Sequence, residues 1–227
     1  MNSAVIIFAK APIPGEVKTR LCPPLDPEEA ASLHGSLVMD AMERTKGLKG
    51  ITLYVAGSPN IDHPFFKVMK ERYNARLLLQ RGPDLGLRMM SAMRDAFDQG
   101  ATNVLLTGTD FPAMPRTHLV EALTLLTKHD VALGPTTDGG YALIGLRKMI
   151  PSLFQGIAWS TATVCAETQK KIAAAGLSLG LIPECRDIDT LNDLQHFIAL
   201  CGKDPTITKR TEGALRLLGA RLKERGA

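Results

Sequence analysis

Three charged side chains in the sequence closely follow segments that we expect to be buried β-strands. Lys18 and Arg20 come after the apolar segment 4–10, and Asp110 comes after the apolar segment 103–107. An ammonium group and a planar guanidinium group suit phosphate oxygens, and a carboxylate suits a divalent cation that bridges such oxygens. Ligands of open α/β sheets usually bind beyond the carboxyl ends of the strands. The spacing therefore predicts a phosphate site there, the alternatives being a solvated basic turn and, for Asp110, a helix cap.

The loop after the third expected strand has further groups that suit a nucleotide. Gly82 and Gly86 would let the backbone approach a ligand, Gln80 could read a base edge with its amide, and Arg88 lies in the first turn of the next helix. An ordinary loop with Asp84 as the helix N-cap explains the same residues. Both interpretations stay open.

A second substrate could lie near the segment Asp138-Gly139-Gly140-Tyr141. Asp138 could bind hydroxyl groups, the glycines could admit a sugar against the backbone, and Tyr141 could add a ring contact. Trp159 could stack on a sugar, although a core aromatic is the equal alternative. A tight turn also explains the glycines, and so short a link predicts antiparallel pairing of the flanking strands.

Two further acids, Asp187 and Asp189, stand two positions apart on a segment expected to be extended. Side chains at this spacing point to the same side, so either acid could complete a metal site with Asp110. Asp189 also suits the N-cap of the helix expected over 191–200. We assign His34 no role, because no second histidine follows at helical spacing.

The elements that must position these groups alternate between strand and helix. This alternation predicts a three-layer α/β/α Rossmann-like fold with a mostly parallel, mixed central sheet. The strands are expected over 4–10, 51–56, 76–80, 103–107, 131–135, 141–146 and 178–182. Asp26-Pro27-Glu28-Glu29 is a strong helix start, with a cap, a proline at the first position and a capping-box glutamate.

Length and composition favour one domain over residues 1–227 that handles small anionic molecules. The net charge is +4, and no Lys/Arg run with interleaved aromatic residues is present, so nucleic acid is not an expected partner. The four cysteines form no CxxC pair, and no apolar stretch reaches membrane-spanning length. A cytoplasmic location is the default expectation. A C-terminal helix over about 206–225 is expected to pack on the domain or on a second copy in a homodimer.

Six motifs together carry a resemblance to a known group of proteins. They resemble the GT-A fold of nucleotide-diphospho-sugar transferases and, more closely, the glycosyltransferase-like family associated with radical-SAM and selenodomain proteins. The motifs are FAKAPIPGEVKTRL, QRGPDLGLRM, GTDFPAMP, GPTTDGGYALIGL, WSTATV and DIDT. Two departures are visible: one acid replaces the Asp-x-Asp metal motif of GT-A glycosyltransferases, and a proline-shaped loop replaces the glycine-rich loop of sugar-nucleotidyltransferases.

The resemblance implies transfer from a nucleotide or nucleotide-sugar donor to a small acceptor, with Mg²⁺ or Mn²⁺ held by Asp110. Lys18 and Arg20 would contact the nucleotide phosphates. The expected nucleotide-binding residues are Phe8, Ala9, Lys10, Gly15, Lys18, Arg20, Gln80, Gly82, Gly86, Arg88 and Thr109. One alternative is nucleotidyl transfer with pyrophosphate release, because VKTRL is similar to a loop of phospholactate guanylyltransferases. The other is a nucleotide-binding protein without catalysis.

Overall fold

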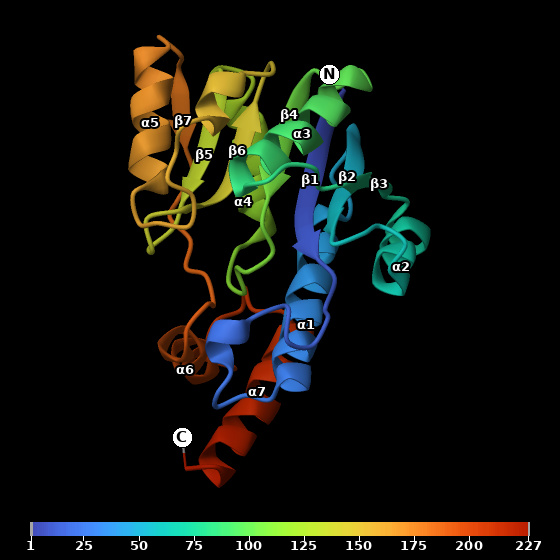
Figure 1. The fold of residues 1–227 in the computed structure, drawn as a ribbon, viewed down its shortest axis with the longest axis vertical. Helices are drawn as coiled ribbons and strands as arrows, with labels where there is room; N and C mark the ends of the chain where they lie inside the picture. Colours follow the sequence, from blue (N-terminus) through green and yellow to red (C-terminus); the bar gives the residue numbers. More distant parts are fainter. Residues whose placement is uncertain (1, 227) are drawn as a thin grey trace.

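The computed structural model describes residues 2–226, which form one seven-stranded sheet with helices on both faces (Figure 1). The strands are β1 (Ser3–Lys10), β2 (Ile51–Ser58), β3 (Arg76–Leu79), β4 (Asn103–Thr107), β5 (Val131–Pro135), β6 (Tyr141–Leu146) and β7 (Leu179–Leu181). The α-helices are α1 (Pro27–Thr45), α2 (Pro64–Tyr73), α3 (Leu85–Asp98), α4 (Arg116–Leu125), α5 (Val164–Ala174), α6 (Leu191–Leu200) and α7 (Lys209–Glu224). Short 3-10 helices cover Thr19–Leu21 and Pro151–Phe154.

The sheet is mixed, as the sequence predicts. Its strand order is β3-β2-β1-β4-β6-β5-β7, and β6 runs antiparallel to both of its neighbours while the other pairings are parallel. The Asp-Gly-Gly link therefore joins an antiparallel pair, β5 and β6, as expected from its length. The predicted three-layer α/β/α fold is confirmed.

Strand β1 is buried on both faces because each face of the sheet carries its own core. Val5 and Ile7 pack in a cluster with residues of α1, α2 and α4, whereas Ala4 and Ile6 pack in a cluster with residues of α3 and α5. Successive side chains of a strand point to opposite faces, so a strand between two helical layers must be apolar throughout.

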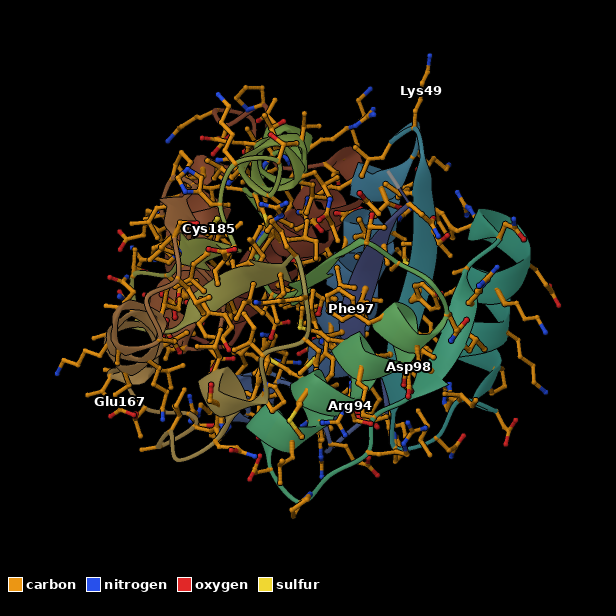
Figure 2. The ribbon with its side chains drawn as sticks, turned by 90° about the horizontal axis from the view of Figure 1, so that it is seen from above. Lys49, Arg94, Phe97, Asp98, Glu167 and Cys185 are labelled. Carbon is orange, nitrogen blue, oxygen red and sulfur yellow. The ribbon has the colours of Figure 1, made fainter. Side chains whose placement is uncertain are left out.

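Helix α3 packs one apolar side on the sheet and presents charged residues to solvent. Figure 2 shows Phe97 turned towards the sheet, and this side chain packs against the second core cluster. Arg94 and Asp98, labelled on the same helix, are exposed. An apolar stripe on one side and charged residues on the other are what anchor a helix on a sheet.

A third core lies beyond the end of the sheet at which β1 stops. Helices α1, α6 and α7 gather there (Figure 1), and the cluster between them includes Leu21, Leu37, Ile188 and Leu215. Leu21 follows the Lys18 loop, and Ile188 lies between Asp187 and Asp189. The cluster therefore holds two of the candidate segments against each other. Within residues 2–226, no helix is both long and apolar enough to cross a membrane.

Candidate functional site

A cavity of about 850 Å³ opens at the end of the sheet where the parallel strands β1 and β4 finish. It receives side chains from every loop that the sequence marked as a candidate. The predicted residues that line it are Phe8, Ala9, Lys10, Lys18, Arg20, Gln80, Arg88, Thr109, Asp110, Asp138, Gly140, Tyr141, Trp159, Asp187 and Asp189. Four predicted glycines are not among the lining residues, namely Gly15, Gly82, Gly86 and Gly139.

Lys18 lies at the centre of the charged part of this cavity. Its Nζ is 2.8 Å from Asp110 Oδ2 and 3.2 Å from Asp189 Oδ1, and it donates a hydrogen bond to the Ile188 carbonyl at 2.7 Å. Only 3% of the side chain is exposed. Burial alone would lower the pKa of Lys18, but Asp110 and Asp189 outweigh it and raise the pKa above its ordinary value. The ammonium group thus stays charged between two carboxylates.

The backbone at Lys18 adopts an unusual conformation to reach this position. Its φ of 51° and ψ of 34° are left-handed, and the 3-10 turn Thr19–Leu21 follows directly. A non-glycine residue in this region carries a steric cost of roughly 1–2 kcal/mol. The buried Leu21 and the ion pairs of Lys18 compensate for that cost.

Asp110 and Arg20 complete the charged group. Asp110 follows β4, and its carbonyl accepts a hydrogen bond from Ile188 N at 3.0 Å, so the two loops are tied by their backbones as well. Burial disfavours the charged Asp110, yet Lys18 holds the pKa of this carboxyl well below its usual range. Arg20 joins through Asp189 Oδ2 at 2.9 Å, and 68% of its side chain is exposed to solvent. Lys18, Arg20 and Asp110, the three charged residues predicted from the sequence, therefore lie together at this end of the sheet.

His34 is a member of this group that the sequence analysis missed. It is on α1, its side chain is 6% exposed, and its Nδ1 lies 3.7 Å from Asp110 Oδ1. A signal was present in the sequence. His34 falls on the helical stripe of Ala30, Val38 and Ala41, which are all buried, so a histidine at that position must face the sheet.

Asp138 and Asp187 lie near enough for their charges to interact. Burial, followed by the charges of Asp138 and Asp189, raises the pKa of Asp187 to about 6. Asp138 Oδ1 accepts hydrogen bonds from Thr136 Oγ1 at 2.5 Å and from Gly140 N at 3.0 Å. Asp138 therefore stabilises the tight turn that the sequence offered as the alternative to a substrate site, and it also lines the cavity.

Gln80 and Arg88 make intramolecular bonds that fix their loop. The amide nitrogen of Gln80 donates to the carbonyls of Ala9 at 3.1 Å and Ala56 at 2.8 Å. Arg88 Nε donates to the Gly82 carbonyl at 2.9 Å. Both residues line the cavity. The side-chain oxygen of Gln80, Oε1, takes no part in the two bonds that its Nε2 donates.

Trp159 and Tyr141 line one part of the cavity, and the Trp159 ring packs directly against Gly86. A Cβ at this position would come within 2.3 Å of the Trp159 indole nitrogen, so only glycine leaves room for the ring. Trp159 in turn meets Tyr141 edge to face at 6.4 Å between ring centroids. Asp84 caps α3, accepting a hydrogen bond from Leu87 N at 2.7 Å, as the ordinary-loop interpretation of this segment expected.

The carboxylates of the cavity could hold a metal ion only if a bound substrate and water supplied the remaining ligands of the ion. Within residues 2–226, no group of three or more His, Cys, Asp and Glu side chains is arranged to hold a metal. Mg²⁺ commonly takes one or two carboxylates and completes its shell with substrate phosphates and water. Asp110 meets that requirement, since 36% of its side chain is exposed at the cavity.

Comparisons with known proteins place this geometry in a family. Residues 41–161 match the model of a family described as "Uncharacterized protein conserved in bacteria (DUF2064)". The chain belongs to the DUF2064 family. No curated protein matches this DUF2064 chain. A crystal structure from Desulfovibrio desulfuricans G20, provisionally assigned as a nucleotide-diphospho-sugar transferase, is 34% identical, with a TM-score of 0.89 over 98% of this chain and 97% of that one.

More distant structures share the fold. A CMP:2-keto-3-deoxy-manno-octonic acid synthetase complexed with CTP is 13% identical to the DUF2064 chain, with a TM-score of 0.56 over 89% and 99% of the two chains. A 4-diphosphocytidyl-2C-methyl-D-erythritol synthase from Anaerococcus prevotii DSM 20548 is also 13% identical, with a TM-score of 0.55 over 84% and 94%. The resemblance to nucleotide-diphospho-sugar transferases noted in the sequence is confirmed by the 34% identical structure, and with it the expectation of a transferase.

Proposed function

We propose that this DUF2064 protein is a transferase that uses a nucleotide-diphospho-sugar donor and passes the sugar to a small acceptor. The observation that carries the proposal is the placement of Lys18 and Arg20 beside Asp110 at the carboxyl end of the sheet, in one cavity that all the candidate loops line. Ligands of open α/β folds bind at this edge. The 34% identical protein with the same provisional assignment supports it.

Each group has a distinct task in this proposal. Arg20, largely exposed, would hold the diphosphate, and Lys18 would turn from its carboxylates towards the negative charge that develops on the departing nucleotide. Asp110, with Asp187 or Asp189 as a second carboxylate, would hold Mg²⁺ or Mn²⁺. Such an ion would neutralise phosphate charge. The acceptor would lie between Asp138 and Trp159, which line the far part of the same cavity.

Nucleotidyl transfer is the second candidate. The same cationic pair would hold a triphosphate, and the fold is shared with a synthetase that was crystallised with CTP. In that reaction a phosphorylated acceptor attacks the α-phosphate, and pyrophosphate leaves in line with it. The two reactions release different products, so they can be separated by one assay panel.

The test combines binding and turnover. We expect thermal stabilisation by nucleotides, together with slow Mn²⁺-dependent hydrolysis of one NDP-sugar. Pyrophosphate release from an NTP plus a phosphorylated acceptor would establish the second candidate instead. Stabilisation by nucleotides without turnover of any of them would make the protein a binder and overturn both enzymatic proposals.

Asp110→Asn gives the sharpest single variant. We expect metal-dependent turnover to fall by about 100-fold or more, because an amide holds a cation far less well than a carboxylate. The melting temperature should also fall, by about 2–10 °C, because Asn keeps the shape of the side chain but Lys18 loses the charge of its partner, so turnover is measured well below the melting temperature. Asp98→Asn is the matched control: Asp98 is exposed on α3 outside the cavity, and its loss should leave turnover unchanged. Full activity in Asp110→Asn would remove Asp110 from the mechanism.

A further inference from the structure

The buried imidazole of His34 has one nitrogen that the fold uses and one that it does not. Nε2 lies 3.2 Å from the Lys10 carbonyl oxygen. A carbonyl oxygen can only accept, so this contact requires the proton on Nε2. Nδ1 of the neutral ring then presents a lone pair. Among the described residues it has no hydrogen-bond partner, although the side chain is only 6% exposed.

The unused nitrogen faces an acceptor. Asp110 Oδ1 lies 3.7 Å from His34 Nδ1, while the other oxygen of Asp110 is taken by Lys18 at 2.8 Å. When the ring is neutral, two lone pairs face each other here, and either a proton on Nδ1 or a metal ion can bridge them. Bonds of about 2.0–2.2 Å from a metal to an imidazole nitrogen and to a carboxylate oxygen can meet across such a separation.

The alternative second ligands are less well placed. Both oxygens of Asp189 already accept bonds, one from Lys18 at 3.2 Å and the other from Arg20 at 2.9 Å. Asp187 lies next to Asp138, whose charge contributes to its raised pKa. His34 lines the same cavity as these acids, and its Nδ1 lies 3.7 Å from Asp110 Oδ1.

We propose that His34 Nδ1 and Asp110 Oδ1 together bind the divalent cation of the nucleotide site, with phosphate oxygens and water completing its shell. The inference rests on the proposed function, because it names the ligand set of that same site. It also has a consequence for metal choice. Imidazole suits Mn²⁺ and the later divalent metals better than Mg²⁺, which prefers oxygen ligands.

The test reads the metal–nitrogen bond directly. Mn²⁺ is added to the full-length protein, alone and with UDP or GDP, and electron spin-echo envelope modulation detects any nitrogen bonded to the ion. We expect ¹⁴N modulation in the wild type, and its replacement by the ¹⁵N pattern when the histidines are ¹⁵N-labelled. That labelled wild-type measurement does not depend on the folding of any variant.

Variants then assign the nitrogen. His34→Gln should abolish the modulation and weaken Mn²⁺ binding about 10-fold or more in calorimetry, with a smaller effect on Mg²⁺. His129→Gln is the matched control. The buried Nδ1 of His129 also has no hydrogen-bond partner in the part of the chain that the structure describes, and His129 is not among the residues that line the cavity. It should keep both the modulation and the affinity.

The outcomes separate this inference from the proposed function. Mn²⁺ bound without nitrogen modulation in the wild type would overturn the role of His34 and leave metal-dependent transfer standing. Modulation that survives in His34→Gln would also overturn it. Failure of Mn²⁺ to bind under either condition would overturn both this inference and the metal in the proposed function, whereas nucleotide stabilisation without metal would still report the phosphate site.

Discussion

Replacing Lys18 by methionine tests whether the central ammonium group holds two carboxylates together. Lys18 Nζ contacts Asp110 Oδ2 at 2.8 Å and Asp189 Oδ1 at 3.2 Å, so these two distances end to end place the oxygens within 6.0 Å of each other. Methionine fills similar space without the charge. The variant therefore leaves the two carboxylates facing each other without the ammonium group, while Arg20 still pairs with Asp189.

The expected cost follows from the separation and the exposure. Two unit charges about 6 Å apart repel by roughly 3 kcal/mol at an effective dielectric constant near 20, and by about 1 kcal/mol or less in water. The carboxylates are 36% and 38% exposed, so solvent screens part of the repulsion. We expect the free energy of unfolding to fall by about 1–3 kcal/mol at pH 7, which is about 2–10 °C in melting temperature for a chain of this length.

The loss should depend on pH in a defined direction. In the wild type the pKa of Asp110 is lowered from its ordinary value of 3.8, so its carboxylate stabilises the fold above that pH, and the contribution is lost as the pH falls through the folded-state value. Lys18→Met removes this contribution. The difference between the two proteins should therefore be largest near pH 7 and shrink below about pH 4.

Urea unfolding at several pH values measures this difference. Lys46→Met is the control: Lys46 is 54% exposed and pairs with Glu43 at 2.7 Å on the surface, so its loss should cost less than about 1 kcal/mol at any of these pH values. Equal stability of Lys18→Met and the wild type at pH 7 would refute the reasoning. So would a difference that does not change with pH.

Two further predictions concern the turn and the acids beside it. Gly139 has φ of +87°, and a Cβ there would lie 2.0 Å from the Ala162 carbonyl oxygen, so Gly139→Ala should destabilise the protein by about 3 kcal/mol or more in urea unfolding. Gly213→Ala, in α7 with open space around it, should instead stabilise by about 0.5–1 kcal/mol; equal effects would contradict the packing described. Asp187 has its pKa raised to about 6, so its ionisation costs stability progressively from about pH 4 to 6. With a metal chelator in the buffer, Asp187→Asn should have a free energy of unfolding about 1–2 kcal/mol higher than the wild type at pH 7, and no higher at pH 3.5. A variant less stable than the wild type at pH 7 would show instead that the fold needs this carboxylate.

The local features of the fold could be read from the sequence because each depends on near neighbours. The unbroken apolar run of β1, the capping box from Asp26 to Glu29 and the cap at Asp84 are all found in the structure. The antiparallel β5–β6 pair follows from a five-residue link that is too short for a crossover. Strand ends and turn residues therefore placed Lys18 and Asp110 at the correct edge of the sheet.

Contacts between distant segments required the tertiary structure. Lys18 reaches Asp189 across 171 positions, and Ile188 anchors that segment in a core built by α1, α6 and α7. His34 meets Asp110 only because α1 packs on β1 and β4 with one particular face inward. Local spacing sets which side of a helix is apolar, whereas packing of whole layers sets what that side touches. Patterns among near neighbours thus specify the fold and the edge of the sheet at which ligands would bind, whereas the packing of distant segments specifies which charges and lone pairs face each other there.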